Sequence, residues 1–147
     1  MATDDFKNVR ITFWNRVKGQ LDTGTYGVAY DGLDFDTDAQ TAWFEPHLLN
    51  EVSLSRRSAN RNEEWLFQVN CFTKTGPLQQ TPVAIWTMVG VVRDAFEYQG
   101  VSSRDWDGAG DPHDVYLLFD EMSAEPIPQD DDHQMMVACT FTGRINE

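Results

Sequence analysis

The chain has 147 residues, of which 24 are acidic and 11 basic, so its formal net charge at pH 7 is −13. This length suits one domain with a substantial core, and an apolar content of 41% is ordinary for a globular protein. The charge disfavours a surface that binds nucleic-acid phosphates broadly. We also expect no membrane span and no signal peptide, because no apolar run is long enough and the start, MATDDFKNVR, lacks the required basic and apolar regions.

Residues 1–18 are predicted to form an amphipathic helix that ends at Gly19. The apolar residues at helical spacing on one face are Phe6, Val9, Phe13, Trp14 and Val17. The polar face has too few Lys and Arg residues for a helix that lies on a membrane, so the apolar face is expected to pack on the core. A short strand is expected at residues 27–30, before the turn signal Asp31-Gly32.

Residues 33–45 form an acidic segment, LDFDTDAQTAWFE. Its acidic residues at the first, third, fifth and last positions of the calcium-binding EF-hand pattern are Asp34, Asp36, Asp38 and Glu45. The position at which that pattern turns sharply needs glycine, and here it is Ala39. We therefore expect a solvated acidic loop rather than a calcium site.

Residues 42–54 are apolar enough for a strand, and Pro46 predicts an edge position or a bulge, because proline cannot donate to the strand ladder. His47 has no second metal ligand nearby in the sequence and is expected to be a surface or packed residue. A polar loop at residues 55–62 is predicted to project as a hairpin between two strands. It holds the chain's only basic cluster, Arg56, Arg57 and Arg61. A phosphate contact, an arm that pairs with an acidic neighbour and a merely solubilising loop are all open for it.

The most informative stretch is residues 53–98, which predicts a strand followed by a helix. One strand face consists of the alternating residues Trp65, Phe67, Val69 and Cys71. A helix then begins at Pro82, and Gly100 is expected to end it. Its apolar stripe consists of Ile85, Met88, Val89, Val92, Ala95 and Phe96. Cys71 and Cys139 have no CxxC spacing and are expected to be buried, reduced thiols.

The remaining residues predict loops and two further strands. Residues 101–114 are expected to be a loop, which lacks the ending of a phosphate-binding glycine motif and holds no metal cluster anchored on rigid strands. A strand at residues 115–119 and a turn or edge segment at residues 125–129 are followed by an acidic tip, Asp130, Asp131 and Asp132. The last strand is expected at residues 135–142, with an apolar face of Met135, Val137, Cys139 and Phe141.

The predicted fold class is α+β, because strands outnumber helices and their spacing is typical of hairpins. We expect a mainly antiparallel, mixed sheet of about four to six strands, with two helices on one face and one projecting hairpin or loop. No linker or internal repeat divides the chain, so residues 1–147 are expected to form a single domain.

Several features follow one another in a distinctive order. They are the N-terminal helix, the strand and turn Val28-Ala-Tyr-Asp-Gly, the loop Ser58-Ala-Asn-Arg-Asn, the strand Trp65-Leu-Phe-Gln-Val-Asn-Cys-Phe, Gly76, a helix that ends in Arg93-Asp-Ala-Phe, and the strand at residues 135–143. In this order they resemble the tail terminator, or tail completion, proteins of long-tailed bacteriophages, the family of the lambda minor tail protein U. The resemblance spans roughly residues 6–141 and departs at the loop of residues 101–114.

The resemblance implies a structural virion protein without catalysis or a cofactor. Its subunits would form a ring, commonly a hexamer, that caps the tail tube, ends its polymerisation and presents a surface to the head-completion or neck protein. Assembly would take place in the host cytoplasm, and genome DNA would pass through the lumen without specific binding. In such a ring we hypothesise that the arginine loop contacts an acidic segment of a neighbouring subunit, either Asp34, Asp36 and Asp38 or Asp130, Asp131 and Asp132.

Other classes of protein stay open. A head–tail joining or neck connector protein would share a small α+β architecture, but it would bind the portal ring instead of the tail tube. An enzyme is disfavoured because His47, His113 and His133 fall in loops or irregular segments and no Ser or Cys lies in a nucleophile motif. A small-molecule or peptide-binding domain would be a monomer with a closed apolar pocket.

Overall fold

The computed structural model describes residues 2–55, 62–74, 82–102, 116–129 and 134–145. The elements in these ranges are α1 (Ala2–Gln20), β1 (Gly27–Val28), the single 3-10 turn η1 (Thr37–Ala39), β2 (Ala42–Ser55), β3 (Asn62–Lys74), α2 (Pro82–Phe96), β4 (Gly100–Ser102), β5 (Tyr116–Phe119), β6 (Ser123–Ile127) and β7 (Gln134–Ile145). The predicted α+β class is confirmed.

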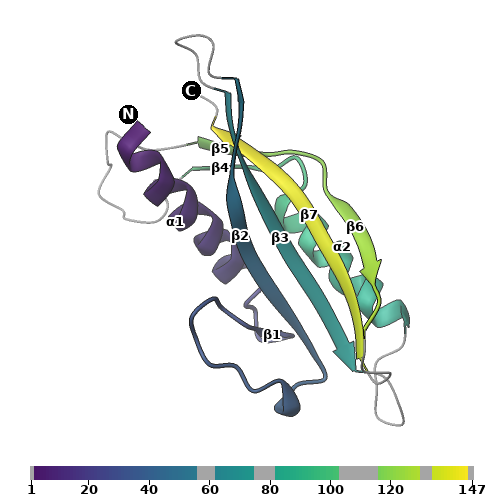
Figure 1. Ribbon diagram of the computed structural model, residues 1–147. Coiled ribbons are helices and arrows are strands. Elements are labelled where there is room, and N and C mark those ends of the chain that lie inside the picture. Colours follow the sequence, from purple (N-terminus) through teal and green to yellow (C-terminus); the bar gives the residue numbers. More distant parts are fainter. Residues whose placement is uncertain (1, 56–61, 75–81, 103–115, 130–133, 146–147) are drawn as a thin grey trace.

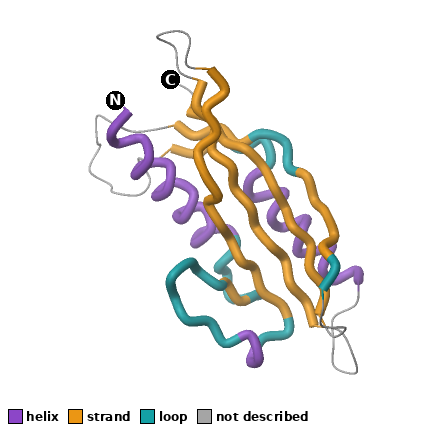
Figure 2. The backbone as a smooth tube through the Cα atoms, viewed as in Figure 1, coloured by secondary structure: helices purple, strands orange, loops and turns teal. Residues whose placement is uncertain are grey.

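All seven strands belong to one mixed sheet, in which β2, β3 and β7 are the long strands (Figures 1 and 2). The order across the sheet is β1-β2-β3-β7-β5-β4, and β6 pairs with β7 beyond the end of β5. Only β1 runs parallel to its described neighbour. β2 and β3 form the predicted hairpin. Their pairing continues to Asn62, whereas the pairing of β3 with β7 ends at Glu64.

Both helices lie on the same face of the sheet (Figure 1). The four alternating residues of β3 that were predicted to share an apolar face are each at most 2% exposed. The Phe13 ring of α1 lies 4.7 Å from that of Phe67 on β3 and 5.6 Å from that of Phe96 on α2. Phe96 also contacts Phe119 and Phe141, at 5.1 and 4.8 Å. These rings join both helices to three strands in one core. Neither helix, over its described residues, has the length and apolarity needed to cross a membrane.

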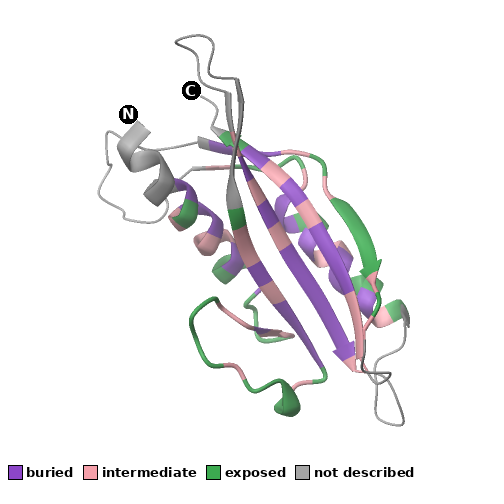
Figure 3. Cartoon of the chain, viewed as in Figure 1, coloured by how far each residue is buried: buried purple, intermediate pink, exposed green. Residues whose placement is uncertain are grey.

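No described helix covers the opposite face of the sheet (Figure 3), which is apolar at one end and mixed elsewhere. At the apolar end, Trp43 of β2 and Phe72 of β3 are cross-strand partners whose rings stack at 5.1 Å. Phe35, from the loop between β1 and β2, lies 6.3 Å from Trp43. Further along, Gln68 donates to the Thr140 hydroxyl on β7 at 3.4 Å. This face therefore has the mixed character that the sequence pattern of β3 predicts.

Pro46 occupies an edge position, as predicted, and the backbone shows why. The Phe44 carbonyl accepts a hydrogen bond from the Ala29 amide at 2.8 Å, so Phe44 directs its backbone groups away from β3. In an antiparallel pair, the N–H and C=O groups of successive residues point alternately towards and away from the partner strand, so the backbone groups of Pro46 also point away from β3. Among the described residues, β1 pairs with Trp43 and Phe44 and no strand continues beside Pro46, so its missing N–H costs no ladder bond there.

Two predicted boundaries differ from the structure. The first helix continues through Gly19 to Gln20, and the second ends at Phe96 instead of extending towards Gly100. Gly100 begins β4, so the segment expected to be a loop from residue 101 onwards starts as a strand. The reason is pairing with β5, since the Phe119 amide donates to the Gln99 carbonyl at 2.9 Å and β4 continues that ladder.

Candidate subunit interface

The open edge of β2 is one surface that another chain could contact. From Glu45 onward, β3 is the one strand that pairs with β2 in the part of the chain that the structure describes. Pro46 and a register shift between Leu48 and Asn50 make this edge irregular. Interruptions of this kind prevent edge strands from pairing indiscriminately, so a partner would have to match this particular edge.

The predicted acidic residues Asp34, Asp36 and Asp38 lie in the exposed loop between β1 and β2 (Figures 1 and 3). The Asp36 Oδ1 atom accepts a hydrogen bond from the Asp38 amide at 3.0 Å and so caps η1. Lys74 Nζ donates to the Asp38 carbonyl at 3.1 Å. The loop is thus exposed, as predicted, and its Asp36 carboxylate stabilises the turn within the loop itself. No three His, Cys, Asp or Glu side chains within the described ranges are grouped so that they could hold a metal ion.

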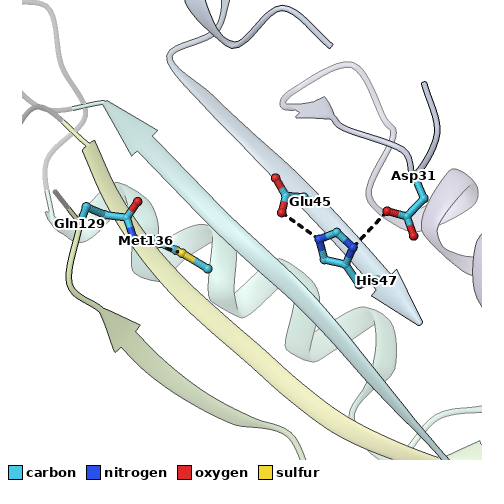
Figure 4. Close-up of polar contacts among 5 residues, drawn as sticks. All are labelled: Asp31, Glu45, His47, Gln129 and Met136. Carbon is cyan, nitrogen blue, oxygen red and sulfur yellow. Dashed lines mark hydrogen bonds and ion pairs between the residues drawn. The ribbon is translucent and has the colours of Figure 1, made fainter. Parts of the chain in front are cut away.

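His47 lies between two carboxylates on the polar face of the sheet (Figure 4). Its Nδ1 is 3.1 Å from Asp31 Oδ1, and its Nε2 is 2.8 Å from Glu45 Oε1. A neutral imidazole has a single N–H, so only the protonated ring can donate to both carboxylates. The side chain of His47 is 26% exposed, and such partly exposed pairs each contribute little to stability. The contact joins the turn after β1 to β2 and thereby positions the acidic loop.

Sequence reasoning expected His47 to be a surface or packed residue and did not find its partners. It also counted His47 among histidines in loops or irregular segments, which is wrong, because His47 lies in β2. Glu45 and His47 are two residues apart on one strand and therefore share a face, which is a signal that the sequence carries. Asp31 is 16 residues away and reaches His47 only because β1 runs parallel to β2. No local pattern indicates that pairing.

The other predicted interface residues lie outside the described residues. They are Arg56, Arg57 and Arg61, in the connection between β2 and β3, and Asp130, Asp131 and Asp132, between β6 and β7. The hypothesised contact between arginines and aspartates of neighbouring subunits therefore stays a prediction.

The end of α2 carries a further exposed feature that the sequence analysis did not single out. Tyr98 has a φ of +58° and is 65% exposed. The preceding Glu97 carboxylate accepts one hydrogen bond from Arg93 Nε at 2.8 Å and another from the Met122 amide at 3.0 Å. These two bonds hold the pKa of Glu97 below its usual value.

Acidic residues near Tyr98 affect its hydroxyl. Partial desolvation raises the pKa of Tyr98, and the carboxylates of Glu121 and Glu97 raise it further, against a smaller opposing effect of Arg93. Asp120 acts in the same direction as the other two acidic residues. The ring is thus an exposed aromatic surface in an anionic setting.

Comparison with known proteins identifies the fold but no family. No protein-family model matches the sequence, and no curated protein matches it either. Among solved structures, one whose name states neither family nor function is similar, with a TM-score of 0.69 and 15% sequence identity. The similarity covers 97% of this chain and 96% of that chain. At this identity, the likeness shows a shared fold over nearly the whole length.

Proposed function

We propose that this protein is a tail terminator of a long-tailed bacteriophage. Its subunits assemble into a ring, commonly a hexamer, at the head-proximal end of the tail tube. The ring ends tube polymerisation and provides the joint to the head-completion or neck protein. No catalytic residue and no cofactor take part. The resemblance of the ordered sequence motifs to that family is the first support for this function.

The structural observation that supports it best is that the sheet has two unlike edges. One side ends at β1 and the open part of β2, and the other at β4 and β6. A ring is built from heterologous contacts, in which each subunit presents two different surfaces to its two neighbours. Exposed sheet edges favour contacts of this kind, because their unpaired backbone groups can bond to another chain.

A head–tail joining or neck connector protein is the second candidate, because the same unlike edges suit any ring of this size. The two functions differ in the partner. A terminator binds the end of the tail tube, whereas a joining protein binds the portal ring.

The first experiment measures the mass of the purified protein by light scattering after size exclusion, with and without tail tubes, and images the same fractions by negative stain. A ring of roughly six subunits, formed alone or on tubes, is the expected result. A strict monomer that ignores tubes would refute the terminator function. Binding to portal rings but not to tubes would favour the joining protein.

A pair of variants tests whether the β2 edge takes part. Leu48 directs its backbone outward, as Phe44 and Pro46 do, so Leu48→Pro removes an edge N–H without removing a bond to β3. Leu48→Ala removes more of the side chain, which packs against the core, but keeps the N–H. We expect Leu48→Pro to impair ring formation and Leu48→Ala to preserve it. Equal behaviour of the two variants would exclude this edge from the contact.

A further inference from the structure

Tyr98 is a residue whose identity the fold of one subunit does not explain. Its left-handed backbone conformation favours glycine, and for other residues it costs roughly 1–2 kcal/mol. Packing within the subunit does little to offset this cost, because 65% of the residue is exposed. Exposed tyrosines are, in contrast, among the residues that contribute most to binding between proteins.

The acidic groups around Tyr98 are unequally engaged. Glu97 is paired with Arg93, and Asp120 lies 3.7 Å from Arg144 and accepts a hydrogen bond from the Thr142 hydroxyl. Glu121, next in the chain, is exposed and makes no ion pair with any residue that the structure describes. The Met122 amide, which follows Glu121, bonds to the carboxylate of Glu97, which precedes Tyr98, at 3.0 Å. This bond brings Glu121 and Tyr98 to the same part of the surface, where the Glu121 carboxylate is available to an incoming cation.

An exposed aromatic ring beside a free carboxylate matches one ligand chemistry, a guanidinium group. Arginine stacks its planar side chain on aromatic rings and pairs with a carboxylate through two parallel hydrogen bonds. Lysine does neither in the same way, because its ammonium is a compact, strongly hydrated point charge with no planar face.

We propose that Tyr98 and Glu121 form the docking site for an arginine from residues 56–61 of a second copy of this chain. This contact rests on the proposed function, since it names a joint between neighbouring subunits of the ring. Charge identifies the occupant: the chain has 11 basic residues against 24 acidic ones, and its only basic cluster is Arg56, Arg57 and Arg61.

The acidic loop of residues 34–38 is a poorer acceptor for the same arginines. It has no exposed tyrosine, and its Asp36 carboxylate already accepts the Asp38 amide. In addition, the arginines of residues 56–61 and the end of α2 belong to different parts of the chain. Repeated head to tail around a ring, a contact between these two different parts of the chain is heterologous.

A binding experiment tests this docking site without requiring a ring. A synthetic peptide of residues 54–63, LSRRSANRNE, is titrated into the whole protein, and binding is followed by backbone amide NMR shifts. The control peptide carries glutamine at its three arginine positions. The variants are Tyr98→Gly and Glu121→Gln, and the matched control is Asp34→Asn/Asp36→Asn/Asp38→Asn. Thermal unfolding accompanies each variant, and Tyr98→Gly should unfold at a higher temperature than the natural protein.

We expect the arginine peptide to shift the amides around Tyr98 and Glu121, and each of these two variants to weaken binding by about threefold to tenfold. The glutamine peptide should not bind, and the triple Asn variant should bind as the natural protein does. The site is refuted if the peptide does not bind, or if only the triple Asn variant weakens it.

Ring formation separates the two proposals. Rings of Tyr98→Gly that are as stable as natural ones would overturn the docking site and leave the terminator function standing. Peptide binding at Tyr98 in a protein that never forms rings would refute the terminator function and leave the binding site for the arginine peptide standing.

Discussion

The same substitution, glycine to alanine, should have opposite effects on stability at two positions. An alanine Cβ at position 143 of β7 would lie 2.8 Å from Phe67 Cε2, 3.2 Å from Phe119 Cδ1 and 3.3 Å from Leu117 Cδ1. The Phe67 ring cannot move away freely, because it is fully buried against several other rings. Overpacking of this kind costs about 1–3 kcal/mol in the free energy of unfolding.

Gly90 lies in the interior of α2, and a Cβ added there meets no atom within 4 Å. Alanine has a higher helix propensity than glycine, so Gly90→Ala should stabilise the protein by about 1 kcal/mol. The two variants should therefore differ by roughly 2–4 kcal/mol in the free energy of unfolding, which is a large part of the stability of a domain of this size.

Urea unfolding of both variants and of the natural protein measures this difference, provided that all three have the same oligomeric state and the same m-value. Phe67→Leu in the Gly143→Ala background isolates the cause, because a smaller side chain removes the 2.8 Å approach. Phe67→Leu should then cost less than it does in the natural protein. A neutral or stabilising Gly143→Ala, or equal costs of Phe67→Leu in both backgrounds, would refute the close-packing explanation.

Three further predictions concern polar groups. Because folding lowers the pKa of Glu97, its carboxylate stabilises the protein above the ordinary glutamate pKa and loses this effect as pH falls through the lower pKa of the folded state. Glu97→Gln should therefore reduce the loss of stability between pH 7 and pH 3.5, measured from urea midpoints. An unchanged pH dependence would contradict this. The hydrogen bond to Cys139, 4.0 Å away, and burial raise the pKa of Cys71. A thiol-specific disulfide reagent at pH 8 should therefore react with neither cysteine in the folded protein and with both after unfolding. Rapid reaction in the folded state would show that the core opens. His47→Ala should release Asp31 and speed proteolytic cleavage between residues 31 and 41, and cleavage at the natural rate would mean that this contact does not hold the loop.

Local patterns in the sequence predicted the long strands and the burial of their apolar faces, because alternation along β3 and β7 needs no knowledge of distant residues. Pro46 also predicted its own edge position, since a missing N–H has few acceptable places in a sheet. The motif Arg93-Asp-Ala-Phe placed the end of α2 correctly at Phe96, but Gly100 was wrong as its stop signal. Gly100 is the usual signal for a helix end, but pairing of β4 with β5 determines where the backbone turns, and Tyr98 takes the left-handed conformation instead.

The candidate interface was less accessible to sequence reasoning. Exposure of the loop around Asp36 follows from its composition, and the structure confirms it. The contacts of His47 with Asp31, and of Glu97 with the Met122 amide, join residues that are distant in sequence through sheet topology. The proposed role of Tyr98 has no sequence signal at all, because only the backbone angle and the exposed ring make this residue unusual.

From Glu45 onward, β2 pairs with β3 alone among the described residues, so its backbone amides should exchange hydrogen with solvent in an alternating pattern. Backbone groups of Glu45 and His47 point to β3, so their amides should exchange slowly, whereas the amide of Leu48 points away and should exchange quickly. A strand added at this edge would protect Leu48 and leave its two slow neighbours almost unchanged. Deuterium uptake at a single peptide group would thus record whether a second chain is bound along β2.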